Sequence, residues 1–531
     1  MYRRIQQPLH LLASRISRHC PRQRIRPFTS RSRRALDDDS SSAAAWKIAI
    51  VGSGPSGCYT GKYLLKSDAM ANSQIDVLDR LPTPYGLVRN GVAPDHPEVK
   101  SVHHDFDSLF MKDGNEDNGQ NLLNFYGNVT VGTDISLEEL REIYDVVVLA
   151  YGCESVRPYD FIQNSKLEGI LSAREFVSWY NGHVDYEWVG PLVEKALKRG
   201  SGQQQVVVIG HGNVALDCAR ILAKTREELD PTDIAARSLN IIDQQNRREI
   251  SVIGRRGHVQ AAFTIKEARE LTRLDDANFV VRKDELDMGR TEASKQEINA
   301  ARPRKRMEKL LTDAAAATSA MKNNTDDDDS QKKAAEVHLR FLLNPTSFET
   351  KDGSSLSHVT CERTRLVGDA GSQSAEGTGE METIEAQLAL VSIGYKGVAI
   401  PGTEEWYDDK RGILKNTHGL IEGSKEDLGG LYVSGWLKRG PSGIIGTNIT
   451  DAKDTVASIL HALKSSSPVD PKEGWKSIDE TLKEKGINPV NWDGYRRIDA
   501  EERSPSRKRS ELQPREKICS REEQLKAAFS S

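Results

Sequence analysis

The sequence predicts an α/β protein built from two Rossmann-like domains, with the second domain inserted into the first. Three observations indicate this architecture. Short apolar runs, typical of buried parallel strands, alternate along the chain with helical patterns. Two of these runs lead directly into a glycine-rich turn and a helical pattern, at Gly52 and again at Gly210. Further apolar runs follow after residue 386.

Seven apolar runs carry the prediction of strands. They lie at residues 47–52, 75–79, 145–150, 205–210, 250–254, 387–393 and 431–435. Because they are almost continuously apolar, they are typical of strands that are covered on both faces of a sheet. We therefore expect the first domain over residues 45–153, the second over 154–386, and a return to the first over 387–531.

Four segments are too polar or too charged to predict regular structure. Residues 112–120, 326–333 and 371–379 have the composition of surface insertions. The four consecutive carboxylates Asp326–Asp329 repel one another, which favours a solvated loop over a binding site. The densely charged tail from Arg496 to Ser531 is expected to run extended over the surface.

The N-terminal segment 1–40 differs in charge from the rest of the chain. It contains ten arginines, no acidic residue before Asp37, and three prolines. This composition predicts a mitochondrial transit peptide, directing the protein to the matrix or to the matrix face of the inner membrane. The alternative is a disordered basic tail. Without these arginines the 74 basic residues fall to 64 against 78 acidic ones. Such an acidic chain is not expected to bind nucleic acid.

Other classes of protein are excluded by composition. No run of about 18 uninterrupted apolar residues occurs, so no transmembrane segment is expected, although peripheral contact with a membrane stays open. The six cysteines form no CxxC pair and no zinc or iron–sulfur ligand set, so no metal site is predicted. Their scatter suits a reducing compartment.

The first glycine turn, Gly52-Ser-Gly-Pro-Ser-Gly57, follows a strand and precedes a helical pattern. The glycines Gly52, Gly54 and Gly57 allow the tight turn, the approach of a pyrophosphate, and close packing of helix on strand. Asp79 stands at the end of the next strand, where a carboxylate suits the hydroxyl pair of an adenosine ribose. The alternative is a glycine turn without a ligand.

The second turn, Gly210-His-Gly-Asn-Val-Ala215, opens another helix. Its next strand ends in Gly254-Arg-Arg-Gly257, where Arg255 and Arg256 replace the acid that would select NAD. Two guanidinium groups favour a 2′-phosphate, although a solvated turn is the alternative. We therefore expect two dinucleotide-binding domains, FAD in the first and NADP(H) in the second, with hydride passing from NADPH to the flavin.

Longer motifs resemble one known family. They are Pro84–Lys100, Gly254–Gly257, Ala262–Glu267, Ala301–Arg306, Ser434–Gly443 and Asp493–Glu502. Together these segments are similar to the mitochondrial NADPH:adrenodoxin (ferredoxin) oxidoreductases. The resemblance runs from about Lys47 to the C-terminal region. It implies an FAD-dependent enzyme that passes electrons from NADPH to a [2Fe–2S] ferredoxin.

The resemblance also implies which residues contact the cofactors. For FAD they are Ser56, Asp79, Leu87, Val131, Trp436, Gly443, Ile444 and Ile445. For NADP(H) they are His211, Gly212, Asn213, Val214, Arg255, Arg256, Glu267 and again Gly443. Two positions depart from the family, which commonly has Gln where this chain has His211 and Glu where it has Asp79. Both substitutions should preserve binding, the second with a shorter reach.

Two further groups of residues are candidates for function. His96 could hydrogen-bond across the domains to Asp217 near the flavin, although a structural histidine and a surface aspartate are an equal alternative. Arg302, Arg304, Lys305 and Arg306 form a basic cluster that would dock an acidic [2Fe–2S] ferredoxin on this acidic chain. The alternative for this cluster is a solvated start of a helix.

Two other functions compete with that of a ferredoxin reductase. One is an NADPH-dependent flavin reductase with another acceptor, like the reductase module of glutamate synthases. The absence of iron–sulfur cysteines and the presence of the basic cluster disfavour it. The other is a flavoprotein scaffold that binds nucleotides without turnover. NADPH would bleach the flavin of an enzyme and leave that of a scaffold unchanged.

Overall fold

The computed structural model describes residues 46–111, 122–199, 202–243, 247–323, 333–424, 430–464 and 472–530. The leader 1–40, the segment 112–120 and nearly all of 326–333 lie outside these residues, so their predictions stay open. Every described residue belongs to one compact unit, Ala43–Ser531. No helix within the described ranges is both long and apolar enough to cross a bilayer.

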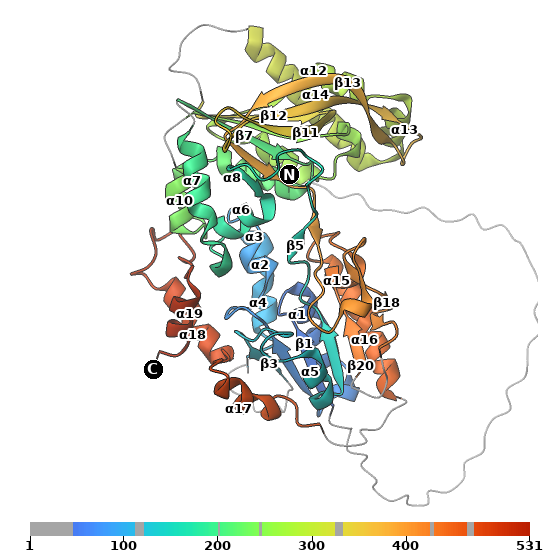
Figure 1. Ribbon diagram of the computed structural model, residues 1–531, viewed down its shortest axis with the longest axis vertical. Coiled ribbons are helices and arrows are strands. Elements are labelled where there is room, and N and C mark those ends of the chain that lie inside the picture. Colours follow the sequence, from blue (N-terminus) through green and yellow to red (C-terminus); the bar gives the residue numbers. More distant parts are fainter. Residues whose placement is uncertain are drawn as a thin grey trace, which may run out of the picture. The chain divides into compact units, whose positions relative to one another are not determined.

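The first sheet contains strands from both ends of the chain. Its order is β18 (Asn416–Thr417), β19 (Leu420–Ile421), β20 (Gly430–Val433), β4 (Val146–Leu149), β1 (Lys47–Val51), β2 (Gln74–Leu78) and β3 (Leu123–Tyr126). The five strands from β20 to β3 are parallel, which is the order of a doubly wound sheet. In Figure 1 the blue N-terminal strand β1 and the orange strand β20 share this sheet. We call this sheet and its helices the first lobe.

The second sheet is parallel throughout. Its order is β6 (Ile170–Ser172), β14 (Leu388–Val391), β7 (Gln203–Ile209), β8 (Arg247–Gly254), β10 (Ala335–Phe341) and β9 (Ala277–Val281). The helices α6 (Ala173–Tyr180), α7 (Val189–Lys198), α8 (Asn213–Ala223) and α10 (Ala236–Ile242) contribute to its core. We call this sheet and its helices the second lobe. The two parallel sheets confirm the predicted fold class.

The chain passes between the lobes at two places that lie side by side. It leaves the first lobe through β5 (Ser155–Val156) and returns through β15 (Tyr395–Lys396), and these two short strands pair antiparallel. The boundary predicted at 386/387 needs a correction, because β14 pairs with β6 and β7 inside the second sheet. The second lobe therefore extends through Val391, although the sequence predicts the return to the first domain at residue 387.

A separate antiparallel sheet lies within the second part of the chain. It consists of β11 (Leu343–Thr350), β12 (Leu356–Val367) and β13 (Ser374–Glu385). The segment 371–379 was predicted to lack regular structure, yet its second half belongs to β13. The expected surface location is confirmed, because most residues of β13 are exposed. Pairing with β12 orders this strand despite its two glycines and its polar residues.

The C-terminal tail corrects another prediction. Residues expected to run extended over the surface instead form α18 (Trp492–Arg503) and α19 (Arg521–Ala528), after α17 (Lys476–Glu484). Tyr495, Ile498 and Ala528 are buried in the core of the first lobe. Several charged residues between the two helices are buried as well, and each has an ionic partner, which composition alone does not reveal.

Candidate active site between two dinucleotide-binding turns

The first glycine turn has the backbone geometry that its sequence predicts. Gly52 has a φ of +107°, and its N–H donates to the carbonyl oxygen of Leu78 at 2.7 Å. A Cβ on Gly57 would lie 1.9 Å from the carbonyl oxygen of Gly52, whereas one on Gly54 would meet no atom within 4 Å. Helix α1 (Pro55–Leu65) begins directly after the turn. Its first N–H groups and the open space at Gly54 suit a pyrophosphate.

Asp79 closes this turn from the neighbouring strand. Its Oδ2 accepts hydrogen bonds from the backbone N–H of Ser53 at 2.9 Å and from the Ser53 hydroxyl, and its Oδ1 accepts from the N–H of Leu81. Burial raises the pKa of the Asp79 carboxyl, and these hydrogen bonds oppose the rise. A carboxylate has about four lone-pair positions, so an acceptor remains for a ribose hydroxyl.

The other predicted FAD residues lie around the first lobe. The hydroxyl of Ser56 donates to that of Ser434 at 2.9 Å, so this side chain ties α1 to the end of β20. Leu87 begins α2 (Leu87–Asn90), directly after Gly86, whose Cβ would lie 3.2 Å from the Cα of Gly54. The Leu87 segment is therefore placed against the first turn. Val131 is buried in the core beside the strand ends of the first sheet.

The second turn repeats the geometry of the first. Gly210 has a φ of +133° and donates its N–H to the carbonyl oxygen of Ile253, and a Cβ on Gly212 would meet open space. Asn213 begins α8, and its side-chain oxygen accepts from the N–H of Thr264 at 2.8 Å. Val214 follows in the first turn of the helix. The open side of this turn again suits a pyrophosphate.

His211 is accommodated as a neutral aromatic ring. It packs against Phe263 and Phe341, with centroid distances of 5.9 and 4.9 Å. Burial lowers the pKa of His211 to about 4, so the ring carries no charge at physiological pH. A Cβ on Gly254 would lie 2.3 Å from its Nδ1, so the glycine at the end of β8 makes room for the ring.

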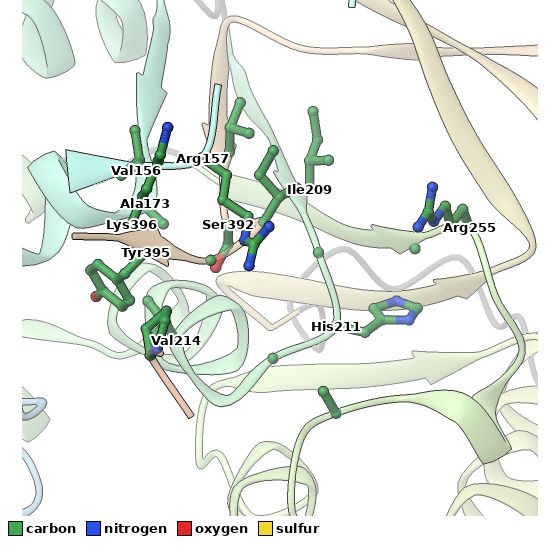
Figure 2. Close-up of a pocket in the computed structure, with 18 of the residues that line it drawn as sticks. Val156, Arg157, Ala173, Ile209, His211, Val214, Arg255, Ser392, Tyr395 and Lys396 are labelled. Carbon is green, nitrogen blue, oxygen red and sulfur yellow. The ribbon is translucent and has the colours of Figure 1, made fainter. Parts of the chain in front are cut away.

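A cavity of about 1030 Å³ brings the predicted NADP residues, except Glu267, together with part of the flavin set. Its wall includes Gly210–Val214, Gly254–Gly257, Trp436 and Gly443. Arg255 and Arg256 are exposed on this wall. Figure 2 shows Arg255 and His211 toward one end of the cavity, and Val214 and Tyr395 toward the other. Such a volume suits an extended dinucleotide.

Two of the predicted flavin contacts, Trp436 and Gly443, line the cavity, and Ile444 and Ile445 follow Gly443 in the chain. Trp436 begins α15 (Trp436–Arg439), and its ring lies 5.5 Å from that of Tyr395. Gly443 has a φ of +82°, and a Cβ there would lie 2.5 Å from the hydroxyl oxygen of Thr447. Ile444 is 70% exposed, and Ile445 is partly buried against the core of the first lobe. This exposure fits an apolar contact for a bound ring.

Sequence reasoning missed several residues of the cavity wall, because they belong to no local motif. Arg157, Arg174, Tyr395 and Lys396 all line it. Arg174 is only 9% exposed, yet its Nε and Nη1 have no hydrogen-bond partner among the described residues. The guanidinium lies over the ring of Tyr186, with its Cζ 5.9 Å from the ring centroid, but this contact leaves the two buried nitrogens without a hydrogen-bond acceptor, which is costly. An anionic ligand such as a dinucleotide phosphate would supply the missing acceptor, so the wall fits NADP(H).

The predicted hydrogen bond between His96 and Asp217 is wrong. The Nε2 of His96 instead lies 2.9 Å from Glu270 Oε2 on α11 (Ile265–Leu271), and the partner of Asp217 is Arg220, at 2.8 Å. Arg220 also holds Glu270 at 3.2 Å and Asp95 at 2.7 Å. His96 and Asp217 thus belong to one network that joins the lobes, but through Glu270 and Arg220.

Glu267 stands at the start of α11, close to this network. Burial raises the pKa of its carboxyl, and the nearby carboxylates of Asp217 and Glu270 raise it further. The hydroxyl of Thr264 donates to Glu267, and the N–H of Thr264 is held by Asn213 of the second turn. The predicted NADP residue Glu267 is therefore connected to the dinucleotide turn by one intervening residue.

The basic cluster Arg302, Arg304, Lys305 and Arg306 is exposed at the start of α14 (Arg302–Asn323). Arg304 pairs with Glu297 at 2.5 Å. The other three make no ion pair within the part of the chain that the structure describes. Their charges are therefore available to an acidic surface.

Comparison with known proteins identifies the family. No family model matches the chain. The chain is 40% identical to the mitochondrial NADPH:adrenodoxin oxidoreductase of Arabidopsis thaliana over 498 residues, which covers 92% of this chain and 96% of the relative. It is 37% identical to the human protein of that name, covering 90% and 91%.

The chain belongs to the NADPH:adrenodoxin oxidoreductase family. It is also 39% identical to the NADPH-ferredoxin reductase FprA of Mycobacterium tuberculosis over 420 residues, covering 78% of this chain and 84% of FprA. The structure of FprA in complex with NADPH matches with a TM-score of 0.78 and 36% identity, covering 92% of this chain and all of FprA. The similarity to NADPH:adrenodoxin oxidoreductases and to FprA thus extends over most of the chain.

Proposed function

We propose that this protein is an FAD-dependent NADPH–ferredoxin oxidoreductase. The observation that carries the proposal is the cavity in which the second glycine turn and Arg255 and Arg256 meet Trp436 and Gly443. A nicotinamide nucleotide bound by the second glycine turn and the two arginines would extend to Trp436 and Gly443, where we place the flavin ring. The names of the relatives support the same donor and the same class of acceptor.

The residues of the chain bind, orient and shield the two cofactors. FAD, when bound, supplies the chemistry that accepts a hydride and releases single electrons. The turn at Gly52–Gly57 and Asp79 hold its adenosine half, and Trp436 and Gly443 border the ring. The turn at Gly210–Val214 holds the pyrophosphate of NADPH, and the two arginines hold its 2′-phosphate. His96 and Asp217 belong to the polar network that joins the lobes, and Glu267 lies close to this network.

The acceptor in this proposal is an acidic [2Fe–2S] ferredoxin that docks on Arg302, Arg304, Lys305 and Arg306. The exposure of these residues and the acidic balance of the rest of the chain support a local basic docking site. The mitochondrial names of the relatives and the composition of the leader support a mitochondrial location, on the matrix side.

The docking site is tested by charge reversal. Arg302→Glu with Arg306→Glu should weaken ferredoxin-dependent turnover at least about tenfold at low salt, because like charges would then face each other. Direct reduction of a small dye by NADPH should be unchanged. The matched control is Lys309→Glu, an exposed residue further along the same helix. Unaltered turnover with ferredoxin would show that this surface is not the docking site.

A second experiment separates this function from its competitors. The purified protein should be yellow, and NADPH should bleach it at lower concentration than NADH. A scaffold would bind FAD without bleaching. A reductase with another acceptor would bleach but gain no cytochrome c reduction on addition of ferredoxin.

A further inference from the structure

The segment 504–520, between α18 and α19, is anchored at both ends on the first lobe. Tyr495 of α18 and Ala528 of α19 are buried in the same core as the strands of the first sheet. Trp492 stacks on Phe110 with a centroid distance of 4.7 Å. The ends of the segment, which we call the strap, are therefore fixed on one lobe, while its middle contacts the other.

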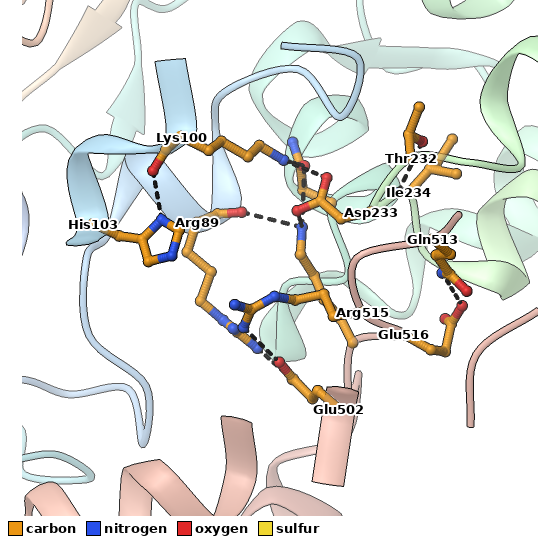
Figure 3. A network of polar contacts seen from close by, with 12 residues as sticks. Arg89, Lys100, His103, Thr232, Asp233, Ile234, Glu502, Gln513, Arg515 and Glu516 are labelled. Atoms are coloured by element: carbon orange, nitrogen blue, oxygen red, sulfur yellow. Dashed lines mark hydrogen bonds and ion pairs between the residues drawn. The ribbon is translucent and has the colours of Figure 1, made fainter. Parts of the chain in front are cut away.

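The middle of the strap contributes a buried ammonium group to a contact between the lobes. Lys517 Nζ lies 3.0 Å from Asp233 Oδ2 of the second lobe and 3.2 Å from the carbonyl oxygen of Arg89 in the first. Lys100 of the first lobe donates to the other oxygen of Asp233 at 2.5 Å. Figure 3 shows the side chain of Lys100 directed toward Asp233. Lys517 contacts the other carboxylate oxygen of Asp233.

This contact is closed to water. The side chains of Lys517, Asp233 and Lys100 are 1%, 9% and 11% exposed. Moving the second lobe relative to the first would separate desolvated charges from their partners, which is strongly unfavourable. The contact therefore restrains the lobes in one relative position.

Other residues of the strap contact the same stretch of the second lobe. Glu516 accepts a hydrogen bond from the N–H of Ala236 at 2.9 Å, and Arg509 donates to the carbonyl oxygen of Ile234 at 2.9 Å. Behind them, Arg515 pairs with Glu502 of α18 at 3.2 Å. The strap thus connects the core of the first lobe to residues 230–236 of the second by several independent contacts.

Covalently, the lobes are joined only through the chain crossings that pair as β5 and β15. A two-stranded ladder restrains bending poorly, whereas hydride transfer requires the donor and acceptor rings to be aligned within a fraction of an ångström. The nucleotide turn, Arg255 and Arg256 belong to the second lobe, and the FAD turn belongs to the first. Besides the ladder, the buried pair between Asp95 and Arg220 and the contacts of the strap restrain the angle between the lobes.

We propose that Lys517, through its contact with Asp233, is a positioning residue for hydride transfer, and that the strap sets the angle at which the nicotinamide of bound NADPH meets the flavin. This inference rests on the proposed function. It assigns a role in the reaction to a segment that contacts neither cofactor turn. The segment acts by holding the second lobe against the first.

The test compares Lys517→Met with Lys517→Arg and with Lys526→Met, an exposed lysine of α19. In stopped-flow mixing, NADPH should reduce the flavin of Lys517→Met at least about tenfold more slowly than that of the wild type. Misplacement of the reacting groups by an ångström lowers a rate constant by up to about a hundredfold. Lys517→Arg should recover part of the rate, and Lys526→Met should match the wild type.

Two further measurements distinguish positioning from a general structural defect. The dissociation constant of NADP⁺ should stay within about twofold of the wild type, because the phosphate contacts lie within one lobe. Reoxidation of the dithionite-reduced protein by ferricyanide should also be unchanged, because it does not involve the second lobe. A slower flavin reduction with these two values preserved supports positioning.

Two outcomes would overturn the inference. One is flavin reduction in Lys517→Met at the wild-type rate. The other is a parallel loss of FAD content, NADP⁺ affinity and reoxidation rate, which indicates a structural role alone. If Lys517→Met does not fold, Asp233→Asn breaks the same contact from the second lobe and faces the same criteria. A wild-type protein that NADPH does not reduce would contradict the proposed function instead.

Discussion

At the scale of single residues, the glycines of the first turn have different neighbours. A Cβ on Gly57 would lie 1.9 Å from a backbone oxygen, whereas one on Gly54 would point into open space. Gly57→Ala should therefore destabilise the protein by several kcal/mol, about the cost of a severe backbone clash. Gly54→Ala should leave the thermal unfolding of the apoprotein unchanged and lower its FAD content at least about tenfold. Full flavin occupancy in Gly54→Ala would show that the pyrophosphate lies elsewhere.

A buried lysine predicts a dependence of stability on pH. Burial lowers the pKa of Lys100 from its ordinary 10.5 to about 7; the carboxylate of Asp233 opposes this shift and the nearby Lys517 adds to it, so between these values the unfolded chain holds a proton that the folded protein has released. Unfolding then takes up a proton, and stability rises with pH. Relative to Lys100→Met, the wild type should gain about 1 kcal/mol per pH unit between pH 8 and pH 10. Denaturant titrations of both proteins measure this difference, and parallel pH profiles would contradict it.

Among the elements, we expect the end of β8 to set the preference for NADPH over NADH. Arg255 and Arg256 follow this strand and line the cavity. Replacing both with glutamine should raise the KM for NADPH at least about a hundredfold, since each arginine loses a charge-assisted contact of about 1.5–3 kcal/mol. The KM for NADH, which lacks the 2′-phosphate, should stay nearly constant. Steady-state dye reduction with both nucleotides is the measurement, and an equal change for both would exclude a 2′-phosphate contact.

The elements that sequence could predict are those with a dominant local signal. All seven apolar runs form strands, because continuous burial on two faces leaves a clear pattern. Strand β13 escaped prediction because its polar residues are ordered by pairing with β12. The strap could not be predicted from the sequence, because charged residues such as Arg515 and Lys517 are buried only where partners distant in the sequence neutralise them. In the site, the glycine turns were predictable, whereas Arg174 and the partner of His96 depend on tertiary placement.

At the scale of the whole molecule, the proposed ferredoxin docking cluster and the nucleotide-binding turns lie at separate places in one compact unit. The two glycine turns belong to different sheets, and one cavity brings residues of the second turn together with Trp436 and Gly443. The exposed basic residues at the start of α14 lie on an otherwise acidic chain. This division predicts that added salt slows electron delivery to ferredoxin and leaves hydride transfer from NADPH unaffected. Stopped-flow flavin reduction and ferredoxin-dependent turnover over a salt series measure the two steps separately, and equal salt dependence would contradict the division.

We propose that electrons pass from NADPH through a bound flavin to a [2Fe–2S] ferredoxin. The most direct measurement is the reduction of cytochrome c by the purified full-length protein with NADPH, with and without a mitochondrial [2Fe–2S] ferredoxin. We expect rapid reduction only when NADPH, the flavoprotein and ferredoxin are all present. Flavin bleaching by NADPH without any acceleration on addition of ferredoxin would contradict it.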